Sequence, residues 1–211
     1  CLISAELVVK RLRGDTTATT LDDTVTVTVV AEDGTETQVP VVEQAIPGGP
    51  VASQVSIRDL GTNGGGFYNT NAAHPFENPN GWSNLLALYL VLLIPLSFPV
   101  AFGRLVGRPR QGAVLLGVMV LLLVSSMFLL SFFETGGNPA MAPLGVDQSQ
   151  SMVQAGGNME GKEVRFGPAT CAQYAAAVTG TSTGSVNCMH DSLTAGGGAV
   201  PMLLMQLGEI A

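Results

Sequence analysis

Two short loops of Gly, Thr and Ser contain the residues best suited to chemistry. The upstream loop (residues 61–66) reads Gly-Thr-Asn-Gly-Gly-Gly, and the downstream loop (residues 180–185) reads Gly-Thr-Ser-Thr-Gly-Ser. Both follow the pattern Gly-Thr-Asn/Ser-x-Gly. Because glycine allows unusual backbone conformations, successive carbonyls of such a loop can point to one side. Carbonyl and hydroxyl oxygens suit a hard, weakly held alkali cation, whereas a transition metal would need clustered His or Cys.

Two uncharged segments could carry these loops into a membrane. Residues 85–102 and 112–133 contain no charged side chain, and a helix needs roughly 20 apolar residues to cross a hydrocarbon core about 30 Å thick. We therefore expect two transmembrane helices, the first one kinked at Pro95 and Pro99. Irregular backbone at membrane depth is tolerated only where protein buries it or where it lines a water-filled path.

Charge is distributed unevenly on the two sides of these segments. The connection between them contains Arg104, Arg108 and Arg110 and no acid, whereas residues 14–81 contain nine acids and one base, Arg58. Short Arg-rich loops stay in the cytoplasm. The pattern predicts a cytoplasmic Arg turn, with the long segments before and after the two helices on the exterior.

The remaining segments suggest smaller elements around the loops. Residues 16–45 alternate Thr and Val around a Glu-Asp-Gly turn, which is typical of a β-hairpin. Short helices are predicted at 51–60 and 169–178, each immediately before one loop. We divide the chain into an exterior segment (1–49), a helix with its loop (50–81), two spans (82–133), an exterior region with the second helix and loop (134–195) and the start of a truncated span (196–211).

Composition excludes several classes of protein. Hydrophobic residues make up 46% of the 211 residues and charged residues 12%, about half the charge of an ordinary soluble protein. A water-facing globule and a disordered chain are therefore both disfavoured. Nine basic residues against sixteen acidic ones also argue against nucleic-acid binding. Neither a Gly-x-x-x-x-Gly-Lys-Ser/Thr loop nor an Asp-Lys-Thr-Gly sequence occurs, so we expect no ATP hydrolysis by this chain.

Three stretches together carry a family resemblance: GPVASQVSIRDLGTNGGGFYNTNAAHPFENPNGWSN, GNMEGKEVRFG and TSTGSVNCMHDSLTAGGGAVPMLLMQLGE. From about Pro50 to Glu209 the chain resembles the potassium-binding, membrane-spanning subunit of the bacterial Kdp potassium-transporting ATPase. The resemblance implies an all-α polytopic membrane protein. Its potassium-channel-like repeats would consist of span, pore helix, filter loop and span, with the β-hairpin as a small exterior insertion.

The resemblance also implies where the ion binds. The second filter loop of the family falls on Thr62, Asn63, Gly64, Gly65 and Gly66, and the third falls on Ser182, Thr183, Gly184 and Ser185. The family commonly has Cys where this chain has Thr183, and a hydroxyl is a harder ligand than a thiol. Residues 1–13 do not match the span expected before the exterior segment.

By the same resemblance, the chain is expected to be a non-hydrolytic, multi-pass subunit in the bacterial plasma (inner) membrane, with its filter loops facing the exterior. Its ligand would be the transported potassium ion, without an organic cofactor. Its partners would be membrane lipid, a catalytic P-type ATPase subunit and small accessory subunits of the same pump. An alternative from another class is a membrane-anchored exterior binding or structural protein, in which the loops are Gly-rich turns and the hairpin is the working part.

A few other side chains could form sites. His74 and His190 are the only histidines and lack a second ligand at metal spacing, so we expect structural, hydrogen-bonded roles. Cys171 and Cys188 would face an oxidising exterior, and both a disulfide and buried free thiols are consistent with the sequence. Asp191 could add negative potential near the downstream loop. The charged residues at 160–165 are expected in a solvated or inter-loop ion-pair network.

Overall fold

The computed structural model describes residues 17–30 and 36–211, which form parts of two compact units, residues 1–53 and 54–211. In the first unit, β1 (Thr17–Val30) and β2 (Glu36–Ile46) pair antiparallel, with Val27 opposite Val39 and a register shift between Thr20 and Val25. These strands occupy the stretch of alternating Thr and Val. The predicted Glu-Asp-Gly turn, Cys1 and the unmatched segment 1–13 lie outside the described residues.

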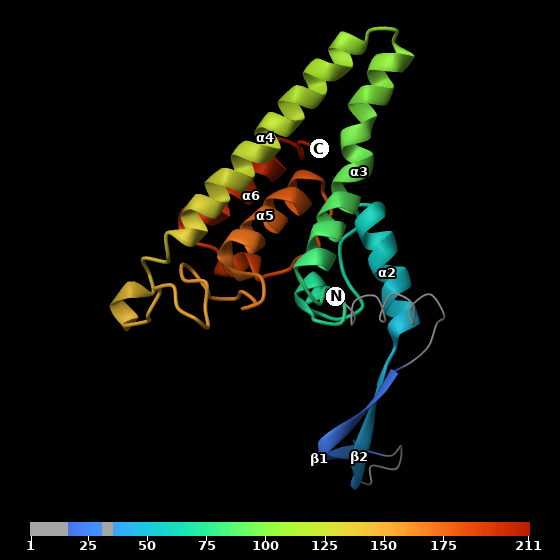
Figure 1. The fold of residues 1–211 in the computed structure, drawn as a ribbon, viewed down its shortest axis with the longest axis vertical. Coiled ribbons are helices and arrows are strands. Elements are labelled where there is room, and N and C mark those ends of the chain that lie inside the picture. Colours follow the sequence, from blue (N-terminus) through green and yellow to red (C-terminus); the bar gives the residue numbers. More distant parts are fainter. Residues whose placement is uncertain (1–16, 31–35) are drawn as a thin grey trace. The chain divides into compact units, whose positions relative to one another are not determined.

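The other regular elements of the described chain are helices, which loops connect (Figure 1). In order they are α2 (Gly48–Leu60), α3 (Gly81–Leu105), α4 (Pro109–Thr135), α5 (Gly167–Gly180) and α6 (Ala195–Gln206), with 3₁₀ turns at Asn71–Ala73, Ala142–Leu144 and His190–Ser192. The element order after α2 and after α5 is therefore the same: a loop, a 3₁₀ turn and a further helix. The predicted short helices correspond to α2 and α5.

The helices α3 and α4 are long and apolar enough to cross a membrane. They have 25 and 27 residues, and their most apolar windows have mean hydropathies of 2.4 and 2.8. Only 22% and 11% of these windows are buried, which is unlike the core helix of a soluble protein. The first of them stays helical through Pro95 and Pro99. Near the connecting turn the two backbones touch, because a Cβ placed on Gly112 would lie 2.4 Å from the Pro99 carbonyl oxygen.

Polar caps fix where α3 and α6 begin. The Asn80 side chain accepts hydrogen bonds from the amides of Trp82 and Ser83, and the Ser83 hydroxyl accepts one from the Asn80 amide. This is a capping box, which satisfies amides that the first helical turn leaves unpaired. The Thr194 hydroxyl likewise accepts from the Gly197 amide at the start of α6.

The last segment, expected to be the start of a span, forms a short helix and a turn. The helix α6 ends at Gln206, and Gly208 then adopts a φ of +79°. This left-handed conformation turns the chain back on itself. As a result, the Ala211 amide donates a 2.8 Å hydrogen bond to the Gly180 carbonyl at the end of α5.

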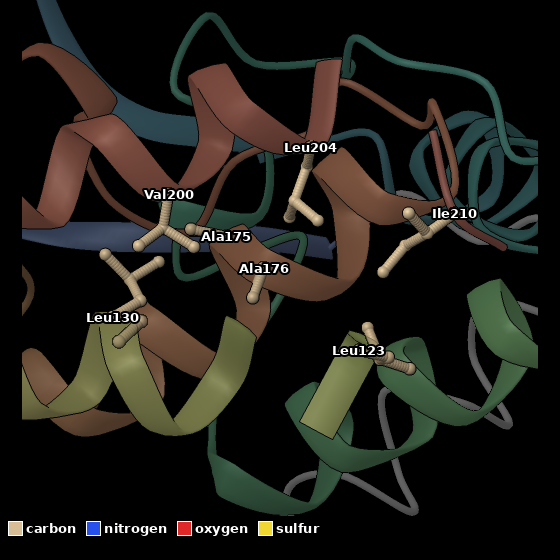
Figure 2. Packing of buried hydrophobic residues seen from close by; sticks show 8 residues of the cluster. Leu123, Leu130, Ala175, Ala176, Val200, Leu204 and Ile210 are labelled. Atoms are coloured by element: carbon tan, nitrogen blue, oxygen red, sulfur yellow. The ribbon is translucent and has the colours of Figure 1, made fainter. Parts of the chain in front are cut away.

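The hydrophobic core of the second unit lies where α4, α5 and α6 meet (Figure 2). Alanines on α5 leave room for the larger side chains of its neighbours. The cluster consists of Leu123 and Leu130 from α4, Ala172, Ala175 and Ala176 from α5, Val200 and Leu204 from α6, and Ile210. In Figure 1, α5 lies between the diverging ends of α3 and α4. The core therefore fixes α5, from which the downstream loop emerges.

Candidate functional site

The upstream loop begins with a defined helix end. The Gly61 amide donates to the Ile57 carbonyl at 2.9 Å, and the Asn63 amide donates to the Arg58 carbonyl at 3.0 Å. The residue between them, Thr62, has a φ of +50°. A left-handed residue at this point reverses the chain and ends the helix, so the loop leaves α2 in a fixed direction.

The downstream loop begins in the same way. The Thr181 amide donates to the Ala177 carbonyl at 3.1 Å, and the Thr183 amide donates to the Val178 carbonyl at 2.8 Å. The intervening Ser182 has a φ of +63°. Neither Thr62 nor Ser182 is a glycine, so the protein holds two ordinary residues in a conformation that few of them adopt.

This geometry changes the correspondence read from the sequence. The Gly-Thr-Asn/Ser-x-Gly pattern aligned Thr62 with Thr181, whereas the helix ends pair Thr62 with Ser182. At the next left-handed position the sequence pattern and the backbone agree. Both pair Gly65 with Gly184, whose φ values are +83° and +70°. One loop therefore has one residue more than the other between its two left-handed positions, which side-chain identity alone does not reveal.

The two loops lie against each other. A Cβ placed on Gly64 would lie 2.6 Å from the Thr183 carbonyl oxygen and 3.3 Å from the Gly184 carbonyl carbon. Real Cβ atoms do not approach so closely, so only glycine fits at position 64 without a shift of the neighbouring backbone. The structure thus brings together the two sets of residues that the sequence placed 120 positions apart.

The backbone of both loops is available to a ligand. Gly64, Gly65 and Gly184 are exposed, whereas the side chains of Thr183 and Ser185 are buried. Within the described part of the chain, no backbone amide donates to the carbonyls of residues 62–66 or 182–185. Carbonyl oxygens that accept no backbone hydrogen bond can replace the hydration shell of a cation.

The Thr183 hydroxyl does not face the exposed side of the loop. It lies 2.7 Å from the Thr181 hydroxyl, which in turn donates to the Ala177 carbonyl at 3.0 Å. The Thr183 side chain is only 1% exposed. The suggestion that this hydroxyl acts as a harder ion ligand than the usual thiol is therefore not supported. The hydroxyl instead stabilises the loop from its buried side, by bonding to Thr181.

A buried carboxylate supports the upstream loop. Glu77 accepts a 2.7 Å hydrogen bond from the Tyr68 amide, and both its oxygens lie 2.7 Å from where a Cβ of Gly66 would be. Arg58 contacts Glu77 at 2.5 Å and Asp59 at 2.8 Å. Burial raises the pKa of Asp59 despite the adjacent guanidinium. This cluster ties the end of α2 to the segment that follows the loop.

Hydrogen bonds join the segments that follow the two loops. The Asn84 side-chain oxygen on α3 accepts from the Asn78 amide group at 2.9 Å and from the Asn187 amide group at 3.1 Å. Arg165 donates to the backbone carbonyls of Ala73 and Asn78. Apart from the Arg165 guanidinium, all these donors and acceptors are uncharged. Directional hydrogen bonds therefore hold the two segments together without a second buried charge.

A second buried carboxylate holds the start of α6, which follows the downstream loop. Glu134 at the end of α4 accepts from the Thr194 amide (2.8 Å), the Thr194 hydroxyl (2.9 Å) and the Asn158 side chain (2.8 Å). Lys162 forms a 2.8 Å ion pair with Glu134, and both side chains are fully buried. The expected solvated or inter-loop network at 160–165 is therefore wrong for Lys162, whose partner lies on a helix. Exposed Glu163 does pair with Arg165 nearby.

Two cavities adjoin the loops. One of about 530 Å³ is lined by Ser182 and Gly184 together with Asp191 and Glu209, so the predicted proximity of Asp191 to the downstream loop is present. Another of about 440 Å³ is lined by Thr62 and Thr181 and by apolar residues of α3 and α4. Each cavity thus reaches loop residues.

The remaining candidate side chains differ in whether they have partners. Cys171 and Cys188 form a disulfide, the alternative that the sequence left undecided. His74 stacks on Tyr68 at 3.9 Å, and its Nδ1 accepts from the Phe76 amide, as expected of a structural histidine. The expected hydrogen-bonded role is wrong for His190, because its buried Nε2 has no hydrogen-bond partner among the described residues, and burial lowers the pKa of His190. Among residues 17–30 and 36–211, no group of three His, Cys, Asp or Glu side chains is placed to hold a metal ion.

Sequence reasoning missed most of the side chains that support the loops. Arg58 and Glu134 did carry a signal, since one is the lone base among nine acids and the other directly follows 22 uncharged residues. Ionisable residues in such surroundings are costly and usually paired. The Asn84 and Asn187 amides carried none, because nothing local distinguishes a bridging amide from a solvated one.

Comparison with known proteins shows the family of this chain. A family model described as "Potassium-transporting ATPase A subunit" matches residues 3–211. A potassium-transporting ATPase potassium-binding subunit of Sorangium cellulosum is 55% identical over 170 residues, which is 81% of this chain and 29% of the relative. Subunits with the same name from Geobacter sulfurreducens and Paracidovorax citrulli are 55% and 53% identical over 80% and 79% of this chain, and 27% and 28% of theirs.

The chain thus spans less than a third of the length of these relatives. The match nevertheless covers both Gly/Thr loops, the helices before them and the two helices long enough to cross a membrane. The protein belongs to the family of the potassium-transporting ATPase A subunit.

Proposed function

We propose that this chain contributes two of the filter loops through which an ATP-driven pump selects potassium on the extracytoplasmic side of the bacterial inner membrane. The ion would shed its water onto the carbonyls of residues 62–66 and 182–185. The observation that carries the proposal is the contact of Gly64 with the Thr183 carbonyl, which brings two glycine-rich, exposed backbones to one place. Potassium filters of this kind work by carbonyl coordination.

The surroundings support a cation path. Asp191 and Glu209 line the larger cavity together with loop residues, and carboxylates near an entrance raise the local concentration of cations. The smaller cavity continues from Thr62 to apolar residues of α3 and α4. The Arg-rich connection of these two helices indicates that their turn lies on the cytoplasmic side.

The free energy for uphill transport would come from a partner. The chain contains neither phosphate-binding nor phosphorylated motif among its 211 residues, and the relatives it matches are named as subunits of an ATPase. We therefore assign ATP hydrolysis to a catalytic P-type subunit, with small accessory subunits completing the pump and lipid covering the exposed faces of α3 and α4. In this proposal potassium is the transported ligand, and we expect no organic cofactor.

A pair of alanine substitutions tests the proposal. In Gly64→Ala the new methyl group collides with the Thr183 carbonyl, so the two loops must separate. In Gly117→Ala on α4 the methyl group meets nothing within 4 Å. We expect the first variant of the assembled pump to need about tenfold more potassium for half-maximal ATPase activity, and the second to behave like the unsubstituted protein. Aspartate at Gly65 or Gly184 should be more damaging still.

Unchanged potassium affinity in Gly64→Ala, Gly65→Asp and Gly184→Asp would refute the proposal. A loss of affinity in Gly117→Ala equal to that in Gly64→Ala would also count against it, because the effect would then be a general response to substitution in this chain.

A further inference from the structure

The stretch that contains the downstream loop runs back along α5 and is joined to it at three successive turns. The disulfide links Cys171 to Cys188, the Tyr174 hydroxyl lies 3.0 Å from the Ser185 hydroxyl, and the Thr183 amide bonds the Val178 carbonyl. Along α5 the joined positions rise from 171 to 178, while along the loop they fall from 188 to 183. The exposed Gly184 lies between the last two of these ties, at Ser185 and at Thr183.

The middle tie is the one placed to control the loop. Cys171 and Tyr174 are three positions apart on α5 and so lie on one face of the helix. Tyr174 and Ser185 are both completely buried, and burial raises the pKa of Tyr174 to about 12, so the phenol keeps its proton. In the described part of the chain, each of these two hydroxyls has the other as its printed hydrogen-bond partner, so removing either one takes that bond from the other, buried hydroxyl.

The upstream loop has no equivalent of this tie in the described contacts, since its support is the carboxylate of Glu77. The tie between Tyr174 and Ser185 instead joins two side chains, one on α5 and one on the loop. Together with the Thr183–Val178 hydrogen bond and the Cys171–Cys188 disulfide, it holds the backbone on both sides of Gly184 to one helix.

We propose that the hydrogen bond between Tyr174 and Ser185, kept in register by the Cys171–Cys188 disulfide, fixes the downstream loop backbone and sets the preference of the site for potassium over the slightly larger rubidium ion. Tyr174 is a positioning residue, since it acts through Ser185 and not by touching the ion. The inference rests on the proposed function, and it adds which side chains determine specificity.

The experiment compares four forms of the assembled pump: Tyr174→Phe, Ser185→Ala, the double variant, and the control Tyr89→Phe, which removes the hydroxyl of a tyrosine that is 57% exposed on α3. For each, ATPase activity is titrated with potassium and with rubidium. We expect the preference for potassium over rubidium to fall about three- to tenfold in either single variant. The double variant should show no further fall, because both substitutions remove one bond.

An unchanged ratio in Tyr174→Phe and in Ser185→Ala would overturn the inference, as would effects that multiply in the double variant. If Tyr174→Phe does not assemble, Ser185→Ala removes the same bond from the loop side and decides the question alone. The failure of this inference is distinct from that of the proposed function. In the first case Gly64→Ala still weakens potassium activation, whereas in the second Gly64→Ala has no effect.

Discussion

The buried ion pair of Lys162 and Glu134 allows a prediction with a definite magnitude. Glu134→Gln keeps the shape of the side chain but removes the charge that balances Lys162, whose amino group lies 2.8 Å away and is fully buried. Removing one partner of a buried pair costs about 3–5 kcal/mol. In a domain of about 200 residues this corresponds to a fall in Tm of about 6–20 °C.

The structure also predicts how a second substitution behaves. Lys162→Met leaves the Glu134 carboxylate with three neutral donors, from Thr194 and Asn158. Lys162→Met should therefore destabilise the protein less than Glu134→Gln does. Combining the two substitutions removes both charges at once. The destabilisation of the double variant should therefore be clearly less than the sum of the single effects.

The assay is thermal unfolding of the purified complex, followed for all three variants and for Glu163→Gln as the control. Glu163 pairs with Arg165, but its side chain is 43% exposed, and exposed pairs contribute about 0–1 kcal/mol. A Glu134→Gln variant as stable as Glu163→Gln would refute the reasoning. Strict additivity of Glu134→Gln and Lys162→Met would refute it as well.

Three further predictions concern the loops. Thr183→Val should lower the free energy of unfolding by about 0.5–1.5 kcal/mol because it removes the hydrogen bond to the Thr181 hydroxyl, which keeps its bond to the Ala177 carbonyl, and Thr183→Ser should lower it much less; equal Tm values for the two would contradict this. Glu77→Gln should weaken potassium activation of the ATPase, since Arg58 loses one of its two carboxylate partners; an unchanged titration curve argues against a supporting role. Because burial lowers the pKa of His190 below its ordinary value of 6.5, the unfolded chain binds its proton first, so stability should decline as pH falls below about 6.5. Tm measured between pH 5 and 7.5 should lose part of this slope in His190→Gln.

The sequence predicted the elements whose signal is local. Two uncharged runs became α3 and α4, whose bounds lie outside both runs. At the start of α3 the reason is that Asn80 and Ser83 cap the helix with polar groups that no hydropathy window includes. Glycine content pointed to both loops. The sequence pattern paired Thr62 with Thr181, whereas the structure pairs Thr62 with Ser182. The left-handed backbone at these two residues depends on where the preceding helix ends and not on residue type.

Long-range partners could not be predicted from the sequence. Lys162 finds Glu134 from 28 positions away and is buried, although its neighbours in the sequence are polar. The disulfide was one of two open outcomes, because the distance between two cysteines depends on how the loop folds back along α5. The early end of α6 likewise depends on Gly208 and on a bond between Ala211 and Gly180.

The central claim is that the upstream and downstream loops bind one ion with their backbones. Its most direct test is a structure of the assembled pump in thallium, a heavy potassium analogue that anomalous scattering locates without ambiguity. The account predicts an anomalous peak within coordinating distance of the carbonyls of residues 62–66 and 182–185, beside the contact of Gly64 with Thr183. Strong thallium peaks elsewhere in the pump, with none at these two loops, would contradict it.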